Sequence, residues 1–294
     1  MRLYSPFTRN RVATAAVADD ATGAQPPDVT VGHAGDGMQL PVLPPRLGPQ
    51  IISIVSPSAG VRASTFSFHL AYELAADHQV LLIDLDEAGG SLAEACHVDG
   101  RLVIERSVEN FYIGTAVPSE RIRSNAIPIT DRRARLQLVA GRRPQAIELG
   151  GGQHLILPRL QDGLRQQDVD IVVLELGACL AYPSVPLLAV ARAIQSVSDR
   201  VIGVLSSDPL YLQHAVQVMN GVGRELLADF VCWRWGSEWV RHTERVWLEE
   251  HPGQPIRAWL DWSDRNYNRW LRTAKPSFDV GDAVRQHLRL GERR

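Results

Sequence analysis

The sequence IISIVSPSAGVRASTFSFHLAYELAADHQVLLIDLDE, residues 51–87, contains two apolar runs separated by one helical pattern. The first run, Ile51–Val55, leads into a loop of small residues, and residues 63–76 then place apolar side chains at a spacing near 3.6. The second run, Val80–Ile83, ends in acidic residues. Continuous apolar runs on either side of an amphipathic helix predict two buried parallel strands joined by a crossover helix. A loop between such a strand and helix presents free backbone N–H groups and the positive end of a helix dipole, which together bind phosphate.

This loop resembles the phosphate-binding loop of the MinD/ParA group, whose pattern after a strand is K-G-G-x-G-K-[ST]-T. The chain reads SAGVRAST over residues 58–65, so that Gly60, Ser64 and Thr65 match the pattern. The acidic IDLD of residues 83–86 matches as well. The resemblance implies an α/β fold of the doubly wound type, with a mostly parallel sheet flanked by helices.

Three of the loop's departures from the family's pattern bear directly on phosphate binding. Ser58 and Ala63 replace the two lysines, and Arg62 replaces the second essential glycine, which directly precedes the second lysine. The loop lysine is the point charge that holds the β- and γ-phosphates, and the chain's single lysine, Lys275, lies far along the sequence. We therefore expect a degenerate site that takes no cofactor, with weak binding of ATP and Mg²⁺ as the alternative. The degenerate nucleotide loop comprises Ser58, Gly60, Arg62, Ala63, Ser64 and Thr65.

Acidic residues end two of the predicted strands. Asp84 and Asp86 follow the second apolar run, and the run at residues 170–174 ends in Glu175, where the family has an aspartate that orients Mg²⁺ through water. If the chain were active, the resemblance implies that Asp84 would orient the attacking water. It likewise implies that Ser64, Asp86 and Glu175 would hold the metal ion.

Further landmarks extend the resemblance over residues 50–220. A predicted strand at residues 200–205 ends in Ser-Ser-Asp-Pro and is followed by a helical pattern, as in the family's next segment. The loop sequence Ala-Ser-Thr at residues 63–65, followed by His-Leu-Ala at residues 69–71, is similar to the TadZ/CpaE branch of pilus-assembly relatives in high-GC actinobacteria.

Composition sets limits on the class of protein. The chain is 45% hydrophobic and 22% charged, with a formal net charge of −2, which is typical of soluble globular proteins and gives no overall attraction to nucleic acid or anionic lipid. No signal-peptide core and no membrane-spanning apolar run is present in the sequence. We predict a cytoplasmic protein with a disordered N-terminal tail and linker over residues 1–49, because that composition cannot bury a core. One α/β domain is predicted over residues 50–294.

The part of the sequence after about residue 226 leaves the family's pattern. The asparagine that reads adenine in relatives is missing there, and all seven tryptophans fall within 38 residues, interleaved with arginines. Tryptophan and arginine are enriched at interaction hot spots, so residues 226–294 are a candidate partner surface. The alternative is that the tryptophans pack C-terminal helices onto the sheet. The tryptophans are Trp233, Trp235, Trp239, Trp247, Trp259, Trp262 and Trp270.

The sequence therefore predicts a non-catalytic scaffold or positioning factor of MinD/ParA type that binds a protein partner. By resemblance, this partner would be a pilus or secretion ATPase, or a protein at the cell pole or septum that recruits the chain. Two alternatives are a divergent weak ATPase and a ParA-like nucleoid or DNA binder, the latter using the arginines between Arg121 and Arg135. In relatives the first loop lysine reaches across an ATP-bound dimer. With Ser58 in its place, we expect a monomer or a homodimer that is independent of nucleotide.

Overall fold

One mixed, mostly parallel sheet organises the part of the chain that the structure describes. The computed structural model describes residues 48–86, 91–112, 115–129, 135–141, 153–181, 186–235 and 237–281, all within one compact unit of residues 44–294. Within these residues eight strands follow the order β3-β4-β2-β5-β1-β6-β7-β8, and only the β3–β4 pair is antiparallel. The strands are β1 Gln50–Val55, β2 Val80–Asp84, β3 Ile127–Pro128, β4 Leu136–Val139, β5 Ile171–Glu175, β6 Arg200–Ser206, β7 Asp229–Arg234 and β8 Ile256–Asp261. The predicted tail lies outside the described residues, apart from residues 48 and 49.

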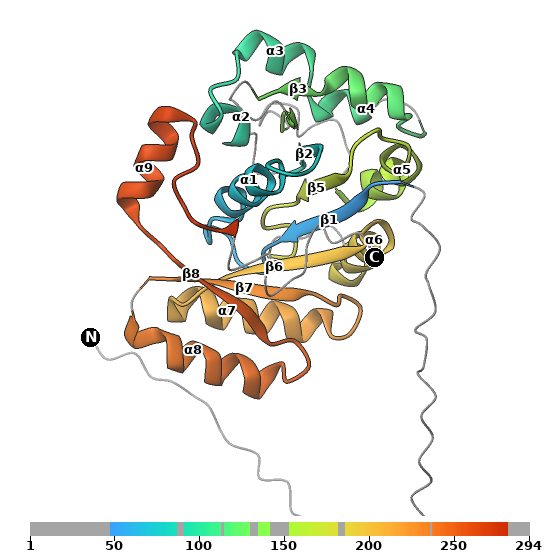
Figure 1. The fold of residues 1–294 in the computed structure, drawn as a ribbon. Helices are drawn as coiled ribbons and strands as arrows, with labels where there is room; N and C mark the ends of the chain where they lie inside the picture. The colour runs from blue at the N-terminus through green and yellow to red at the C-terminus, as the bar shows by residue number, and fades with distance from the viewer. Residues whose placement is uncertain are drawn as a thin grey trace, which may run out of the picture. The chain divides into compact units, whose positions relative to one another are not determined.

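Helices cover both faces of the sheet (Figure 1). Helices α1, α2 and α9 pack on one face, and α5, α6, α7 and α8 pack on the other. The predicted doubly wound α/β fold is confirmed. The helices are α1 Ala63–Leu74, α2 Ser91–Ala95, α3 Gly100–Glu105, the 3-10 helix η1 Val108–Tyr112, α4 Ser119–Asn125, α5 Gln153–Arg165, α6 Leu187–Val197, α7 Pro209–Val222, α8 Ser237–Glu250 and α9 Asp264–Thr273.

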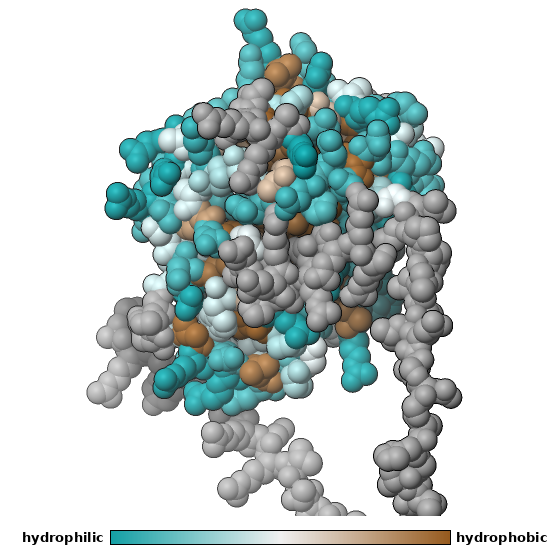
Figure 2. All heavy atoms as spheres, in the orientation of Figure 1, coloured by the Kyte–Doolittle hydropathy of each residue, from teal (hydrophilic) through white to brown (hydrophobic). Residues whose placement is uncertain are grey.

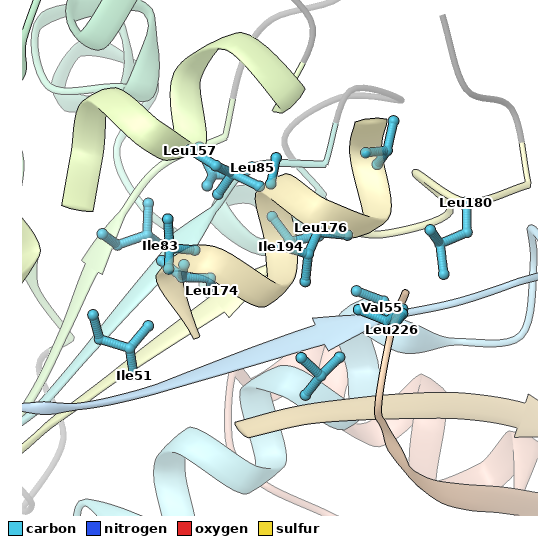
Figure 3. Close-up of a cluster of buried hydrophobic side chains, with 14 of the residues drawn as sticks. Ile51, Val55, Ile83, Leu85, Leu157, Leu174, Leu176, Leu180, Ile194 and Leu226 are labelled. Carbon is cyan, nitrogen blue, oxygen red and sulfur yellow. The ribbon is translucent and has the colours of Figure 1, made fainter. Parts of the chain in front are cut away.

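The central strands β1, β2 and β5 are buried along nearly their whole length. The first apolar run of the sequence forms β1, which lies between β5 and β6 with Ile51, Ile52 and Ile54 fully buried. Figure 3 shows part of this core, where side chains of β1 and β5 meet residues of α5 and α6 such as Leu157 and Ile194. Burial on both faces explains why these strands read as unbroken apolar runs.

Strand β8, at the C-terminal edge of the sheet, was not predicted from the sequence. In strand β8 only Ala258 and Leu260 are buried, because the strand lies at the edge of the sheet and is only partly covered. Its charged and exposed residues therefore interrupt the apolar run that marks a central strand.

The prediction that all seven tryptophans form one partner surface is wrong for three of them. Trp233, Trp247 and Trp270 are buried, since their large side chains fill the space between the sheet and the helices that flank β7 and β8. Trp235 and Trp239 are 41% exposed and remain available on the surface. Trp259 and Trp262 are partly buried and pack against the two cores. The alternative weighed from the sequence, packing onto the sheet, therefore explains most of the cluster.

The face of the molecule in Figure 2 is mainly hydrophilic, with small scattered hydrophobic spots. No described helix is both long and apolar enough to cross a membrane. Large contiguous apolar surfaces mark interaction sites, and the described residues on the face in Figure 2 show none.

His69 ties α1 to residues 262–281, here called the C-terminal segment. Its Nδ1–H donates to the carbonyl of Thr65 at 2.7 Å, and its Nε2 accepts the backbone N–H of Ser277 at 3.1 Å. The ring packs edge-on against Trp270 and Phe278. Burial lowers the pKa of His69 to about 4, because the charged imidazolium would lose its hydration.

The buried neutral state of His69 makes the stability of the chain sensitive to acid. The folded pKa lies below the unfolded value of 6.5, so the stability contributed by His69 is present above pH 6.5 and lost as pH falls toward about 4. We expect the difference in unfolding free energy between the natural chain and His69→Phe to shrink by about 3 kcal/mol from about pH 7.5 to about pH 4. Urea unfolding followed by tryptophan fluorescence measures it. Comparing the two chains at each pH cancels the titration of all other groups. A difference in unfolding free energy that does not change with pH would contradict the lowered pKa of His69.

Candidate functional site

The loop that follows β1 lies at the carboxyl edge of the sheet, beside the ends of β5 and β6. A cavity of about 450 Å³ opens against it, bounded by the loop, α1, α2 and α9. Gly60 has a φ of +77°, a left-handed conformation that favours glycine. The lining residues are Ser56, Ser58, Ala59, Gly60, Val61, Arg62, Ala63, Ser64, Thr65, Asp86, Glu94, Ala95, Gly177, Ala178, Tyr267, Trp270 and Leu271.

Ser58, at the family's first lysine position, is held by α7. Its Oγ donates to the carbonyl of Tyr211 at 2.8 Å and lies 3.1 Å from Nδ1 of His214. The loop is closed further by a hydrogen bond from the hydroxyl of Ser56 to the carbonyl of Ser58. Ser58 is 2% exposed, so this position neither carries charge nor projects outward toward a second molecule.

Arg62, at the family's second glycine position, adopts the left-handed conformation with φ 66° and ψ 38°. A residue with a Cβ pays about 1–2 kcal/mol for this conformation, which is why glycine is usual here. The guanidinium carbon lies 5.2 Å from the ring centre of Trp262 and 4.7 Å from that of Tyr267. These are cation–π distances. The arginine side chain thus turns toward the C-terminal segment.

Helix α1 begins at Ala63, the position of the phosphate-gripping lysine in the family's pattern. Ala63 is 7% exposed and supplies no charge. The next residue, Ser64, donates from its Oγ to Oε1 of Glu175 at 3.3 Å, and Thr65 is buried with its carbonyl bonded to His69. The structure therefore brings together Ser64 and Glu175, two of the three predicted metal ligands.

Asp84 and Glu175 form a buried acidic pair. They are register partners on β2 and β5, and both are fully buried. Burial, and then the nearby carboxylate of Asp86, raise the pKa of Asp84 to about 7. Burial, followed by the charges of Asp84 and Asp86, raises the pKa of Glu175 well above its usual value. Oε2 of Glu175 is buried with no hydrogen-bond partner, so the pair is best satisfied when it retains a proton.

Of the acidic residues predicted to act at the site, Asp86 is the one that lines the cavity. Its carboxylate lies against Gly177, where an added Cβ would come within 2.3 Å of Oδ1. Gly177 also has a φ of +54°, so this turn after β5 requires glycine for two reasons. Asp84, the residue predicted to orient a catalytic water, instead accepts backbone N–H groups of Asp86 and Leu92 and does not line the cavity.

These side chains do not fit Mg-ATP as the family's pattern would hold it. Neither lysine position supplies an ammonium group, and the guanidinium of Arg62 lies against aromatic rings. No group of three histidine, cysteine or carboxylate side chains within the described ranges is placed to hold a metal ion.

Several residues of the site were not identified from the sequence. Tyr211 and His214 on α7 and Tyr267 on α9 contact the loop across 150 or more intervening residues. No local pattern pairs them with the loop. The one available signal was that an arginine replaced a loop glycine, because an arginine at such a position needs a partner somewhere in the fold.

Comparison of the structure with solved structures gives several similar proteins. A ParA family ATPase from Chlorobium tepidum is 14% identical, with a TM-score of 0.59 over 81% of this chain and 92% of that chain. A putative plasmid partition protein from Borrelia burgdorferi, bound to AMPPNP, is 20% identical, with a TM-score of 0.57 over 82% of this chain and 96% of that one. A chain of the MinC:MinD cell division protein complex of Aquifex aeolicus is 16% identical, with a TM-score of 0.61 over 83% and 97%.

No protein-family model and no curated protein sequence matches the chain. The structural similarities cover nearly the whole length of the solved chains, at identities too low to carry a site residue by residue. They establish that the chain has the fold shared by ParA and MinD proteins.

Proposed function

We propose that the chain is a non-catalytic, MinD/ParA-like pseudo-ATPase that acts as a scaffold or positioning factor. The observation that carries this proposal is the state of the loop. Ser58 is bonded to α7, Ala63 has no charge, and the guanidinium of Arg62 lies on Trp262 and Tyr267. Phosphoryl transfer depends on positioned charge around the γ-phosphate, and the one charged side chain of this loop, Arg62, lies against two aromatic rings.

The process that we propose for the scaffold comes from the sequence resemblance to the TadZ/CpaE branch. The chain would position a pilus or secretion (Tad-like) machinery, or a machinery of the pole or septum, through a protein partner. The solved structures with this fold include a partition protein and a cell division complex, so a positioning role fits their described functions. Trp235 and Trp239 are the exposed tryptophans that follow β7 at the carboxyl edge, and they are the part of the predicted partner surface that we retain. Leu210 and Tyr211, which follow β6, are exposed as well.

A divergent weak ATPase is the second candidate. The cavity beside the loop favours it, because about 450 Å³ is open there and Ser64 and Asp86 line it. A pocket of this size accommodates a small-molecule ligand. The two candidates differ in whether Mg-ATP binds the natural chain.

Calorimetry with Mg-ATP distinguishes them. We expect the natural chain to give no binding heat at millimolar Mg-ATP, because no cation in the loop is free to hold phosphate. The double variant Arg62→Gly, Ala63→Lys restores the glycine and the phosphate-gripping lysine of the family's pattern. We expect it to bind Mg-ATP if the rest of the pocket is intact.

The matched control for this experiment is the double variant Arg62→Gly, Ala63→Leu, which opens the loop without adding charge. Binding by both double variants would mean that Arg62 alone blocks the pocket. Clear binding by the natural chain would overturn the pseudo-ATPase proposal and favour the weak ATPase.

The oligomeric state tests the same proposal independently. In the MinD/ParA proteins that the sequence resembles, the first loop lysine reaches across the dimer to the ATP of the other subunit. Ser58 of this chain is instead buried and hydrogen-bonded within its own subunit. We expect the molar mass by light scattering to be identical with and without Mg-ATP. A doubling of mass on addition of Mg-ATP would contradict the expectation.

The buried acidic pair predicts a stability gain in a variant. Folding raises the pKa of Asp84 to about 7 and the pKa of Glu175 well above its usual value, so stability contributed by their protons is present at low pH and lost as pH rises through these raised pKa values. Glu175→Gln keeps an oxygen for the Gly177 N–H and removes a charge. We expect it to be more stable than the natural chain by about 1–2 kcal/mol at about pH 8 and by less at about pH 5.5.

Differential scanning calorimetry at the two pH values measures this gain. The matched control is Glu225→Gln, which removes an exposed carboxylate paired with Arg192 and should change stability little at either pH. A Glu175→Gln variant that loses stability at pH 8 would show that the carboxylate has a positively charged partner, which a bound cation would supply.

A further inference from the structure

Arg62 has unusual surroundings for an arginine in this chain. The ion pairs of the described residues join arginines such as Arg165, Arg192 and Arg234 to carboxylates, and none of them involves Arg62. Its Nε is buried with no hydrogen-bond partner. The side-chain contacts that hold the guanidinium are with the rings of Trp262 and Tyr267.

The two rings have the geometry of a cation site. Their centres are 5.3 Å apart with an angle of 42° between the planes, and the guanidinium lies within 5.2 Å of both. Trp262 is fixed in place by its neighbours, because it stacks on Trp235 and Phe278 and its indole N–H donates to Asp264 at 2.9 Å. A rigid pair of aromatic faces at this separation attracts a guanidinium or ammonium group.

The cation site lies where the C-terminal segment begins. Farther along the segment, Trp270 stacks on Phe68 of α1, Leu271 accepts a hydrogen bond from Nε2 of His97, and Ser277 bonds to His69. These contacts attach the segment to α1 and to the turn after α2. Arg62 alone among the residues of the degenerate nucleotide loop contacts the segment through a charged group.

We infer that Trp262 and Tyr267 form an aromatic cation site that is filled by the chain's own Arg62, and that this contact holds the C-terminal segment closed over the loop. The site takes a guanidinium or ammonium group. The contact also explains why a residue other than glycine persists in the left-handed conformation at this position, since such strain survives where surrounding contacts compensate for it.

Hydrogen exchange on the full chain tests the inference. Arg62→Lys retains a cation, whereas Arg62→Met retains an apolar side chain of similar length without the charge. Both variants keep a residue with a Cβ at position 62, so the backbone strain there is the same. We expect the amides of α9 to exchange on the order of tenfold faster in Arg62→Met than in the natural chain, with Arg62→Lys between them. Packing by the stem alone would give Met and Lys the same protection, and that result would overturn the inference.

A double-mutant cycle assigns the effect to the ring. Tyr267→Leu should accelerate exchange in α9, whereas Tyr267→Phe, which keeps the aromatic face, should not. Combining Arg62→Met with Tyr267→Leu should give no more than the larger single effect, because both changes remove the same contact. Single effects that multiply in the double variant would contradict the assignment.

Two controls keep the result interpretable. Arg269→Met removes an exposed arginine of α9 itself and should leave exchange there unchanged. Amides of β1 report global stability, so a local effect appears in α9 without an equal change in β1. The measurement uses no nucleotide. Mg-ATP binding by the natural chain would therefore overturn the proposed function and leave this inference standing. Unchanged exchange of the α9 amides in Arg62→Met would overturn this inference and leave the proposed function standing.

Discussion

The parallel pairing of β1 with β5 and β6 is the constraint on which the site depends. Because β1 is buried on both faces and paired on both sides, its carboxyl end cannot shift, and the loop that follows must leave the sheet between the ends of β5 and β6. The register of β2 with β5 places Asp84 beside Glu175, and Ser64 at the start of α1 lies within reach of Glu175. The geometry that suits a phosphate-binding loop is therefore kept by the core, whatever side chains the loop carries.

The side chains have found partners inside the protein. Ser58 bonds to α7, Arg62 lies on two aromatic rings of the C-terminal segment, and Glu175 retains a buried carboxyl whose pKa is raised by burial and by neighbouring acids. A buried acidic pair without a cation costs stability at neutral pH, and residues at binding sites commonly carry such a cost. Here the cost remains while the charges that would hold phosphate are missing. The proposed non-catalytic role accounts for this combination.

Much of the fold was predictable because central parallel strands have a strong sequence signature. The apolar runs at Ile51–Val55, Val80–Ile83 and residues 170–174 coincide with β1, β2 and β5, and the loop landmarks gave their order. The candidate site was predicted only in part. Ser64 and Glu175 come together as expected, but Asp84 lies behind the cavity. Contacts from Tyr211, His214 and Tyr267 could not be predicted, since they depend on helices far along the chain.

The sequence by itself determined the fold class and the chemistry that the loop lacks, because buried strands need apolar runs and an absent lysine cannot be supplied by folding. Tertiary structure decided where the remaining groups went. The tryptophans after residue 226 are the same residue type but occupy three environments: Trp247 is buried, Trp262 faces Arg62, and Trp239 is exposed. Their environments depend on the packing of β7, β8 and α9 against the sheet. Composition and spacing do not determine whether a side chain near the edge of a sheet is covered by a helix or exposed to solvent, because this depends on long-range packing.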